Sequence, residues 1–445
     1  MSPCAKTSTP KRHLLSNGRP LCFALAVLNT AHFASAPAEA GDACCAQQKE
    51  AAFAALTGDW GGVRSSLKER GIQFLGDYTS ELFGNPAGGR QRGAVVDGLA
   101  RLFLDVDLEK TLGWNGAAFR VSGLYAHGTS GSLRYVGDAA FFSSIDAYDG
   151  VRLLDFWVEQ HLFDEKAALR IGQMPFDTEF GVSDVAGLFI NASYGVPSPP
   201  VTPMPFGAYP VTALGIQIKV EPAKGFYGKA GVYDGNPSPG DFPDPSDGVT
   251  QPAKRYGTDW ALRPSEGALW AGELGYQRSE GAFPGTYRIG ALYHSDDFAD
   301  VRSDFAGTIR RGSTSGYYVI DQTLWKKAGD AEESVSAFVR GTVAEKKTSL
   351  MSNSLQFGAV YTGLVSTADK LGVSFARSDF SPGQLFNVDG RAYQPDHETV
   401  AELTYQIPLK PYLRVQPDLQ YIRHPGGTTA YQNAWVLGIR ATVDF

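Results

Sequence analysis

The sequence predicts an all-β protein: a transmembrane antiparallel β-barrel of about 16 strands, with a short helical segment before the first strand. Three observations lead to this prediction. From Gly71 to Phe445, apolar residues recur at every second position, which is the period of a strand. No stretch of the 445 residues contains the ~18 to 20 apolar residues that a membrane-spanning helix needs. Glycine supplies 51 residues, aromatic residues make up 12% and methionine only 4 residues, a composition that favours sheet.

The first 40 residues have the features of an export signal. They begin with basic residues, continue with an apolar run at 21–28 and end in Ala38-Glu39-Ala40, a small-x-small cleavage pattern. We expect cleavage after Ala40, because cleavage after Ala36 would leave Pro37 at the first mature position. A short amphipathic helix of the folded protein is the alternative interpretation.

The mature chain is acidic, which disfavours several partners. Loss of the leader removes four basic side chains and one acidic one, so the formal charge changes from -7 to -10. A chain of this charge is a poor candidate for nucleic acid or anionic substrates. Cys44 and Cys45 are adjacent and cannot cross-link a fold, and the sequence near them lacks further metal ligands. We therefore expect no nucleic-acid partner, no metal and no cofactor, and an incidental cysteine pair.

Residues 41–70 are predicted to form an N-terminal helical segment outside the barrel. Residues 46–56 are rich in alanine, and Val63 and Leu67 lie four residues apart before Gly71, a typical helix stop. A turn at 57–62 separates the two parts. Because the segment lacks alternation, we place it in the periplasm or against the lower mouth of the barrel. We expect the barrel, residues 71–445, to close without it.

The alternation is clearest at 100–108, where Arg101, Asp105 and Asp107 share one face and apolar residues occupy the even positions. In the run around 157, Leu154, Phe156 and Val158 are expected to face outward. Sixteen such runs fit the chain, centred near residues 77, 103, 121, 157, 171, 215, 230, 271, 290, 320, 339, 359, 374, 403, 417 and 439. Each can supply the ~9 to 11 residues with which a tilted strand crosses a bilayer.

A secreted β-sandwich would also show alternation, but three features favour a barrel in the outer membrane. The polar faces carry charges of both signs at strand centres, which a packed core would not accept. Aromatic residues lie toward strand ends, as in interface girdles: Tyr125, Tyr276, Tyr287, Tyr293, Tyr317, Trp325, Tyr361 and Tyr421. Phe445 also falls on the lipid-facing register of the last strand, where the outer-membrane assembly machinery is expected to recognise it.

The connections divide into short turns and long loops. Residues 221–224 and 408–411 are predicted periplasmic turns, and 128–151, 184–210, 235–264 and 380–396 are predicted external loops. The loop at 184–210 contains an uncharged, proline-rich run at 196–206. Because an ordinary mobile loop would be more polar, we expect this loop to pack inside the barrel and narrow it; an external cover loop is the alternative.

Four blocks of sequence resemble the carbohydrate-selective porin (OprB) family. They are 56–64 with Leu67 and 71–72; 157–160 with 169–173 and 179–180; 209–210 through 231–237; and 416–422 with 424–427. Tyr412 and His424 depart from the residues common in the family, Trp and Asn, without affecting the fold prediction. The resemblance implies a sixteen-stranded outer-membrane barrel that admits sugars by diffusion.

Enzyme classes are disfavoured. Residues 312–316 have Thr314 where a nucleophile elbow needs serine. The five histidines after the leader are scattered singly, so none forms a metal-ligand spacing.

The sequence therefore predicts passive diffusion of small neutral, glucose-like sugars through a water-filled barrel, with a general, non-selective porin as the alternative. The candidate pore-lining residues come from two polar faces: Asp155, Trp157, Glu159 and Arg170, and Arg414, Gln416, Asp418 and Gln420. Glu159 and Arg170 are expected to share one ring, because their strands pair through a short turn. A charge ladder that only supports the wall is the alternative role. The even alternation gives no argument for an oligomer.

Overall fold

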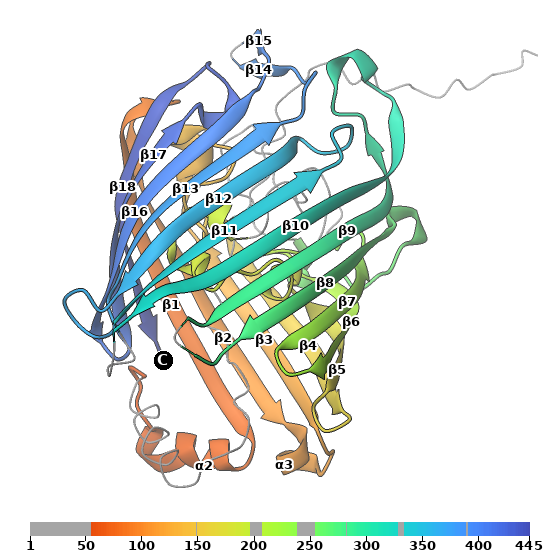
Figure 1. Cartoon of the computed structure of the whole chain (residues 1–445), viewed down its shortest axis with the longest axis vertical. Coiled ribbons are helices and arrows are strands. Elements are labelled where there is room, and N and C mark those ends of the chain that lie inside the picture. Colours follow the sequence, from red (N-terminus) through yellow and green to blue (C-terminus); the bar gives the residue numbers. More distant parts are fainter. Residues whose placement is uncertain are drawn as a thin grey trace, which may run out of the picture.

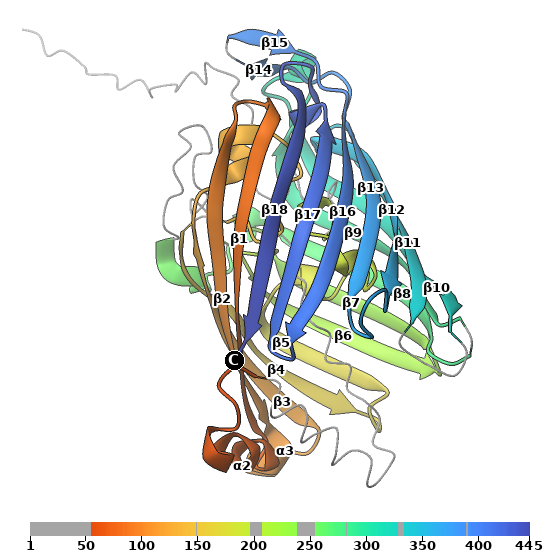
Figure 2. The ribbon, with the colours of Figure 1, turned by 90° about the vertical axis from the view of Figure 1, so that its left-hand side faces the viewer.

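The computed structural model describes residues 55–147, 149–195, 207–237, 254–281, 283–327, 333–388 and 390–445. The predicted leader, Cys44 and Cys45, and the proline-rich run at 196–206 lie outside these residues. Within them, sixteen strands form one closed antiparallel barrel, shown in Figures 1 and 2. Closure leaves no unpaired strand edge, which is the condition for a sheet in a membrane.

The barrel strands follow the chain in order, and β1 pairs with β18 to close the ring. Their bounds are β1 (Ile72–Gly89), β2 (Gly93–Asp107), β3 (Ala117–His127), β4 (Gly150–Leu162), β5 (Ala167–Met174), β6 (Ala213–Ala223), β7 (Phe226–Asp234), β8 (Ala268–Arg278), β9 (Gly285–Ala299), β10 (Ile309–Lys326), β11 (Ser334–Ala344), β12 (Met351–Thr362), β13 (Lys370–Phe380), β16 (His397–Lys410), β17 (Leu413–Arg423) and β18 (Gln432–Asp444). Each of the sixteen predicted centres falls inside one of these strands, so the fold prediction is confirmed. A separate two-stranded sheet of β14 (Phe386–Val388) and β15 (Arg391–Tyr393) lies in the loop after β13.

Two predictions of side-chain direction were wrong. Leu154 is 1% exposed and packs with Leu99 and Leu124 in an inward cluster, whereas Phe156 on the same strand faces outward at 43% exposure. The ladder between β3 and β4 shifts at this point, and an extra residue in one strand reverses the alternation. Tyr317 is also buried, and its hydroxyl donates to Glu273 at 2.8 Å instead of joining an outer girdle.

The two ends of the barrel differ. Short turns lie at one end together with η1 (Trp60–Gly62), α2 (Val63–Glu69) and α3 (Leu108–Leu112), below the strands in Figure 1. This is the periplasmic end in the predicted orientation, and it holds the predicted turns at 221–224 and 408–411. Long loops occupy the other end. No helix among the described residues is long and apolar enough to cross a membrane.

Two of these long loops fold back into the barrel. They carry the short helical turns η2 (Ser132–Val136), η3 (Phe176–Thr178), η4 (Ala186–Leu188) and η5 (Ala192–Tyr194). Phe142, Leu188 and Ile190 of these loops pack against inward residues of the wall such as Phe83 and Phe338. The described part of the loop at 184–210 therefore lies inside the barrel, as expected. The remaining turns are η7 (Lys254–Gly257), η8 (Pro264–Glu266), η9 (Ser303–Phe305) and η10 (Pro425–Gly427).

Candidate functional site: the pore lining

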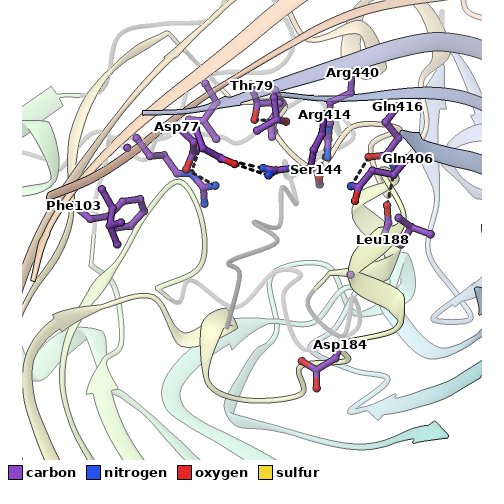
Figure 3. Close-up of a pocket in the computed structure, with 18 of the residues that line it drawn as sticks. Asp77, Thr79, Phe103, Ser144, Asp184, Leu188, Gln406, Arg414, Gln416 and Arg440 are labelled. Atoms are coloured by element: carbon purple, nitrogen blue, oxygen red, sulfur yellow. Dashed lines mark hydrogen bonds and ion pairs between the residues drawn. The ribbon is translucent and has the colours of Figure 1, made fainter. Parts of the chain in front are cut away.

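A cavity of about 940 Å³ lies inside the barrel, between the inward loop and the periplasmic end. We call it the main cavity. Its wall includes the inner faces of β1, β2, β17 and β18 together with residues 182–185 and 187–188 of the loop. Figure 3 shows Asp77, Arg414 and Gln416 on one side of this space and Asp184 of the loop on the other.

Pairs of arginine and aspartate line the wall at this level. Arg101 and Asp77 are cross-strand neighbours on β2 and β1, with an ion pair of 2.9 Å. Arg414 of β17 pairs with Asp444 of β18 at 2.5 Å. Pairing holds each guanidinium in place, and a guanidinium has five N–H donors, so donors remain for a solute.

A third pair adds an aromatic surface to the wall. Arg120 of β3 bonds Asp105 of β2 through two contacts of 2.6 and 2.7 Å. The guanidinium carbons of Arg101 and Arg120 both lie 5.7 Å from the ring centroid of Phe103, which also borders the cavity. Charged donors and an apolar ring therefore stand side by side.

The first group of predicted residues forms a network beside this wall. Glu159 and Arg170 face each other across β4 and β5, with an ion pair of 2.7 Å, so the two residues share one level of the barrel. Arg170 also pairs with Glu179 at 2.6 Å and stacks 4.3 Å from the ring centroid of Trp157. Burial alone would raise the pKa of Glu179, but the charges of Arg170 and Lys229 hold this pKa well below its ordinary value.

Asp155 and Trp157 are both buried in this network. Asp155 accepts hydrogen bonds from Ser122 at 2.6 Å and from the indole of Trp157 at 3.1 Å. Trp157 borders a smaller pocket of about 460 Å³ at the periplasmic end, together with Asp105 and Arg120. Neither Asp155, Glu159 nor Arg170 belongs to the wall of the main cavity as the structure describes it.

The second predicted group divides along β17. Arg414 and Gln416 border the main cavity, and Gln416 donates to the Leu188 carbonyl at 2.8 Å (Figure 3). Asp418 and Gln420 lie farther up, under the inward loops. There Gln420 donates to the Phe142 carbonyl at 2.8 Å and to Asp418 at 2.8 Å.

Sequence reasoning missed most of the arginine–aspartate wall. Asp77, Arg101, Phe103, Arg120 and Asp444 were not among the candidates, although Arg101 stands in the clearest alternating run. The sequence did contain a signal for this wall. Charged residues at 101–107 share the inward face of one strand, and the next strand carries the basic residue Arg120. Adjacent antiparallel strands bring such charges into direct pairs.

A family model described as the carbohydrate-selective porin, OprB family, matches residues 91–445. Porin B of Pseudomonas aeruginosa is 30% identical over 428 residues, covering 88% of this chain and 91% of that protein. The putative porin QuiX of Acinetobacter baylyi is 24% identical, covering 88% of this chain and 93% of that protein.

The fold has a solved counterpart. The high-pH structure of Pseudomonas putida OprB superposes with a TM-score of 0.79 at 24% identity, covering 88% of this chain and 98% of that chain. The family model spans most of the chain, and the sixteen-stranded closed barrel agrees with it. This chain belongs to the OprB family of carbohydrate-selective porins, which are outer-membrane transport channels.

Proposed function

We propose that this porin passes small neutral, glucose-like sugars and that their path runs through the main cavity, along the arginine–aspartate wall. The observation that carries the proposal is the pairing of Asp77 with Arg101 and of Asp105 with Arg120 around Phe103. Both pairs have low net charge, which suits a neutral solute better than an ion.

The chemistry fits a polyhydroxyl solute that must enter and leave. A selective channel needs affinity that is favourable but modest. Guanidinium donors can bind neighbouring hydroxyls, and the ring of Phe103 can stack on the apolar face of a pyranose. Asp184, whose side chain is 50% exposed, can accept from a hydroxyl on the loop side.

The proposal gives the predicted residues different roles. Arg414 and Gln416 contact the solute, because they border the main cavity. The remaining six, Asp155, Trp157, Glu159, Arg170, Asp418 and Gln420, support the wall and the loops through the bonds described above.

Sugar-dependent block in planar bilayers tests this path. We expect Arg101→Met and Arg120→Met to weaken block by glucose roughly 10-fold or more, because each loses charged hydrogen bonds worth about 1.5–3 kcal/mol. Leu102→Val, on the outward face of the same strand, is the matched control and should behave as wild type. A wild-type pore that is blind to glucose would instead indicate a general diffusion porin, and block that survives both arginine substitutions would move the sugar path elsewhere.

We also propose that Phe445 is recognised by the outer-membrane assembly machinery and that the outward apolar face contacts lipid. The Phe445 amide donates to the Gly76 carbonyl at 2.8 Å, at the seam between β18 and β1. Phe445→Asp should leave export intact but prevent insertion, as measured by heat-modifiable migration on a gel. Normal migration of this variant from the outer membrane would contradict the proposal.

A further inference from the structure

Residues 55–70 precede the barrel and carry the first block of family resemblance, yet the sugar path described above does not use them. Figures 1 and 2 show α2 below the periplasmic ends of β1 and β2, close to the C-terminal end of β18. The contacts of this segment with the barrel give it a role in the pore.

Arg64 binds the segment to β1 and to the end of β18, the two strands whose pairing closes the barrel. Its guanidinium donates to the carbonyl of Phe74 on β1 at 2.9 Å and to the main-chain oxygen of Phe445 after β18 at 2.6 Å. The Leu56 amide adds a bond of 2.8 Å to the carbonyl of Asp444. The segment is therefore bound to both strands of the seam. β1 and β18 also pair directly along their length, so closure of the barrel without the segment stays a prediction.

The motif around Arg64 fixes how α2 is presented. Asp59 accepts from both the amide and the hydroxyl of Ser65 at 2.8 Å. Gly61 and Gly62 have φ values of +70° and +95°, which residues with a side chain rarely adopt. The ring of Trp60 lies 5.2 Å from the Arg64 guanidinium carbon. These contacts hold the Arg64 side chain in place. The residues that follow it in α2 then lie next to the barrel.

As a result, α2 forms part of the cavity wall. Arg64, Ser65 and Lys68 border the main cavity, and Lys68 also borders the smaller periplasmic pocket. Arg101 and Arg414 in the same wall have carboxylate partners, whereas in the part of the chain that the structure describes neither Lys68 nor Lys370 of β13 has an ion pair, and of these two only Lys68 belongs to the N-terminal segment. A cation without an ion-pair partner beside an aqueous path attracts anions and repels cations.

We propose that residues 55–70 form the periplasmic exit of the pore, with Arg64 as the positioning residue and Lys68 as the charge that determines ion preference there. This rests on the proposed path through the main cavity. The motif Asp59-Trp60-Gly61-Gly62-Val63-Arg64 then serves transport as well as anchoring, because it holds a charged side chain at the mouth.

The proposed role of Lys68 at the periplasmic exit can be tested by measuring reversal potentials of the full mature protein in a KCl gradient. Lys68→Gln should lower the anion-to-cation permeability ratio, and Lys68→Glu should lower it further, with little change in conductance. Arg70→Gln and Arg70→Glu are the matched controls, because Arg70 is an exposed cation at the end of the same helix and does not border the cavity; they should leave the ratio unchanged. Arg64→Ala should lower the ratio like Lys68→Gln and also raise the conductance, because the segment is released from the mouth.

Each result decides part of the proposal. If Lys68→Glu shifts the reversal potential no more than Arg70→Glu does, the exit role is refuted, whether or not Arg64→Ala folds. If Lys68→Glu acts as expected but a folded Arg64→Ala keeps wild-type selectivity and conductance, Arg64 is not the positioning residue. Glucose block in Arg101→Met, compared with Leu102→Val, reports separately on the sugar path, because this comparison uses no Lys68 variant.

Discussion

The periplasmic and extracellular halves of the inner wall carry the same kinds of side chain but use them differently. On β1, Asp77 in the lower half pairs with Arg101 and borders open space. Four residues higher, Glu81 is 2% exposed, pairs with Arg440 and accepts from Ser143 of an inward loop at 2.5 Å. On this strand the lower carboxylate borders open space, and the upper one holds a loop.

Inward ionisable residues also hold the loops elsewhere around the ring. In the upper half, Glu402 accepts from the amides of Ile190 and Asn191 at 2.6 and 3.0 Å. In the periplasmic half of β10, Asp321 accepts from the Ser183 hydroxyl at 2.5 Å, and Arg340 of β11 donates to the Ser193 carbonyl at 2.7 Å. Buried backbone groups of a loop need partners, and the inward polar residues of the strands supply them. The loops that narrow the pore are therefore held against the wall by hydrogen bonds to ionisable side chains of the strands.

The largest effect on conductance and stability should come from a substitution that releases the inward loop at 181–195 from the wall. Glu402→Ala leaves two buried amides without acceptors, at a cost of roughly 1–3 kcal/mol each. We expect the loop at 181–195 to leave its position, the conductance to rise and the melting temperature in detergent to fall. Single-channel recording and heat-modifiable migration measure the two effects.

Leu403→Ala, on the outward face of the next position of β16, is the control. It should leave conductance unchanged. A Glu402→Ala pore with wild-type conductance would show that this carboxylate does not hold the loop.

The second prediction compares two arginines that both border the main cavity but have carboxylate partners at different heights on β1. Arg440→Met leaves the buried Glu81 carboxylate without its cation, which costs about 3–5 kcal/mol. Arg101→Met leaves Asp77 beside a solvent-filled cavity and should cost less, roughly 1–3 kcal/mol, while it raises cation preference. Thermal unfolding and reversal potentials of both variants check the contrast. Equal losses of stability would remove the distinction between the two halves.

The strand pattern could be predicted because a period of two is a local property of the chain. Arg101 and Leu102 face opposite sides of the sheet whatever the rest of the barrel does. Leu154 shows the limit, because a single extra residue in β4 reverses the direction of its side chain and no local signal marks it.

The candidate site was harder to predict. Alternation tells which side chains point into the barrel, but it does not tell whether such a side chain borders the cavity or contacts a loop. Arg414 and Gln420 share one face of β17, yet Arg414 borders the main cavity and Gln420 is buried under a loop from another part of the chain. That loop contact joins residues 278 positions apart in the sequence. Only the three-dimensional arrangement separates solute-facing residues from those that hold the loops.

The smallest expected effect is a change in stability and ion preference with pH that arises from Asp177. Asp177 follows β5, borders the main cavity and is buried, and burial raises its pKa to about 7. The folded state therefore prefers the protonated carboxyl. This contribution to stability is complete below the unfolded pKa of about 4 and is lost as the pH rises through 7.

Between pH 6 and pH 8 the loss of stability from Asp177 should be about 1.4 kcal/mol, which is the free energy that corresponds to one unit of pKa. Over the same interval the pore gains one negative charge, so its cation preference should rise. Asp177→Asn should reduce both changes by the part that this one carboxyl contributes. Burial and the charge of Glu398 also raise the pKa of Asp138, in the other inward loop, so part of the decline in stability with pH should persist in this variant. Melting curves and reversal potentials at pH 6, 7 and 8 measure both changes, and identical profiles for wild type and Asp177→Asn would place the titrating group elsewhere.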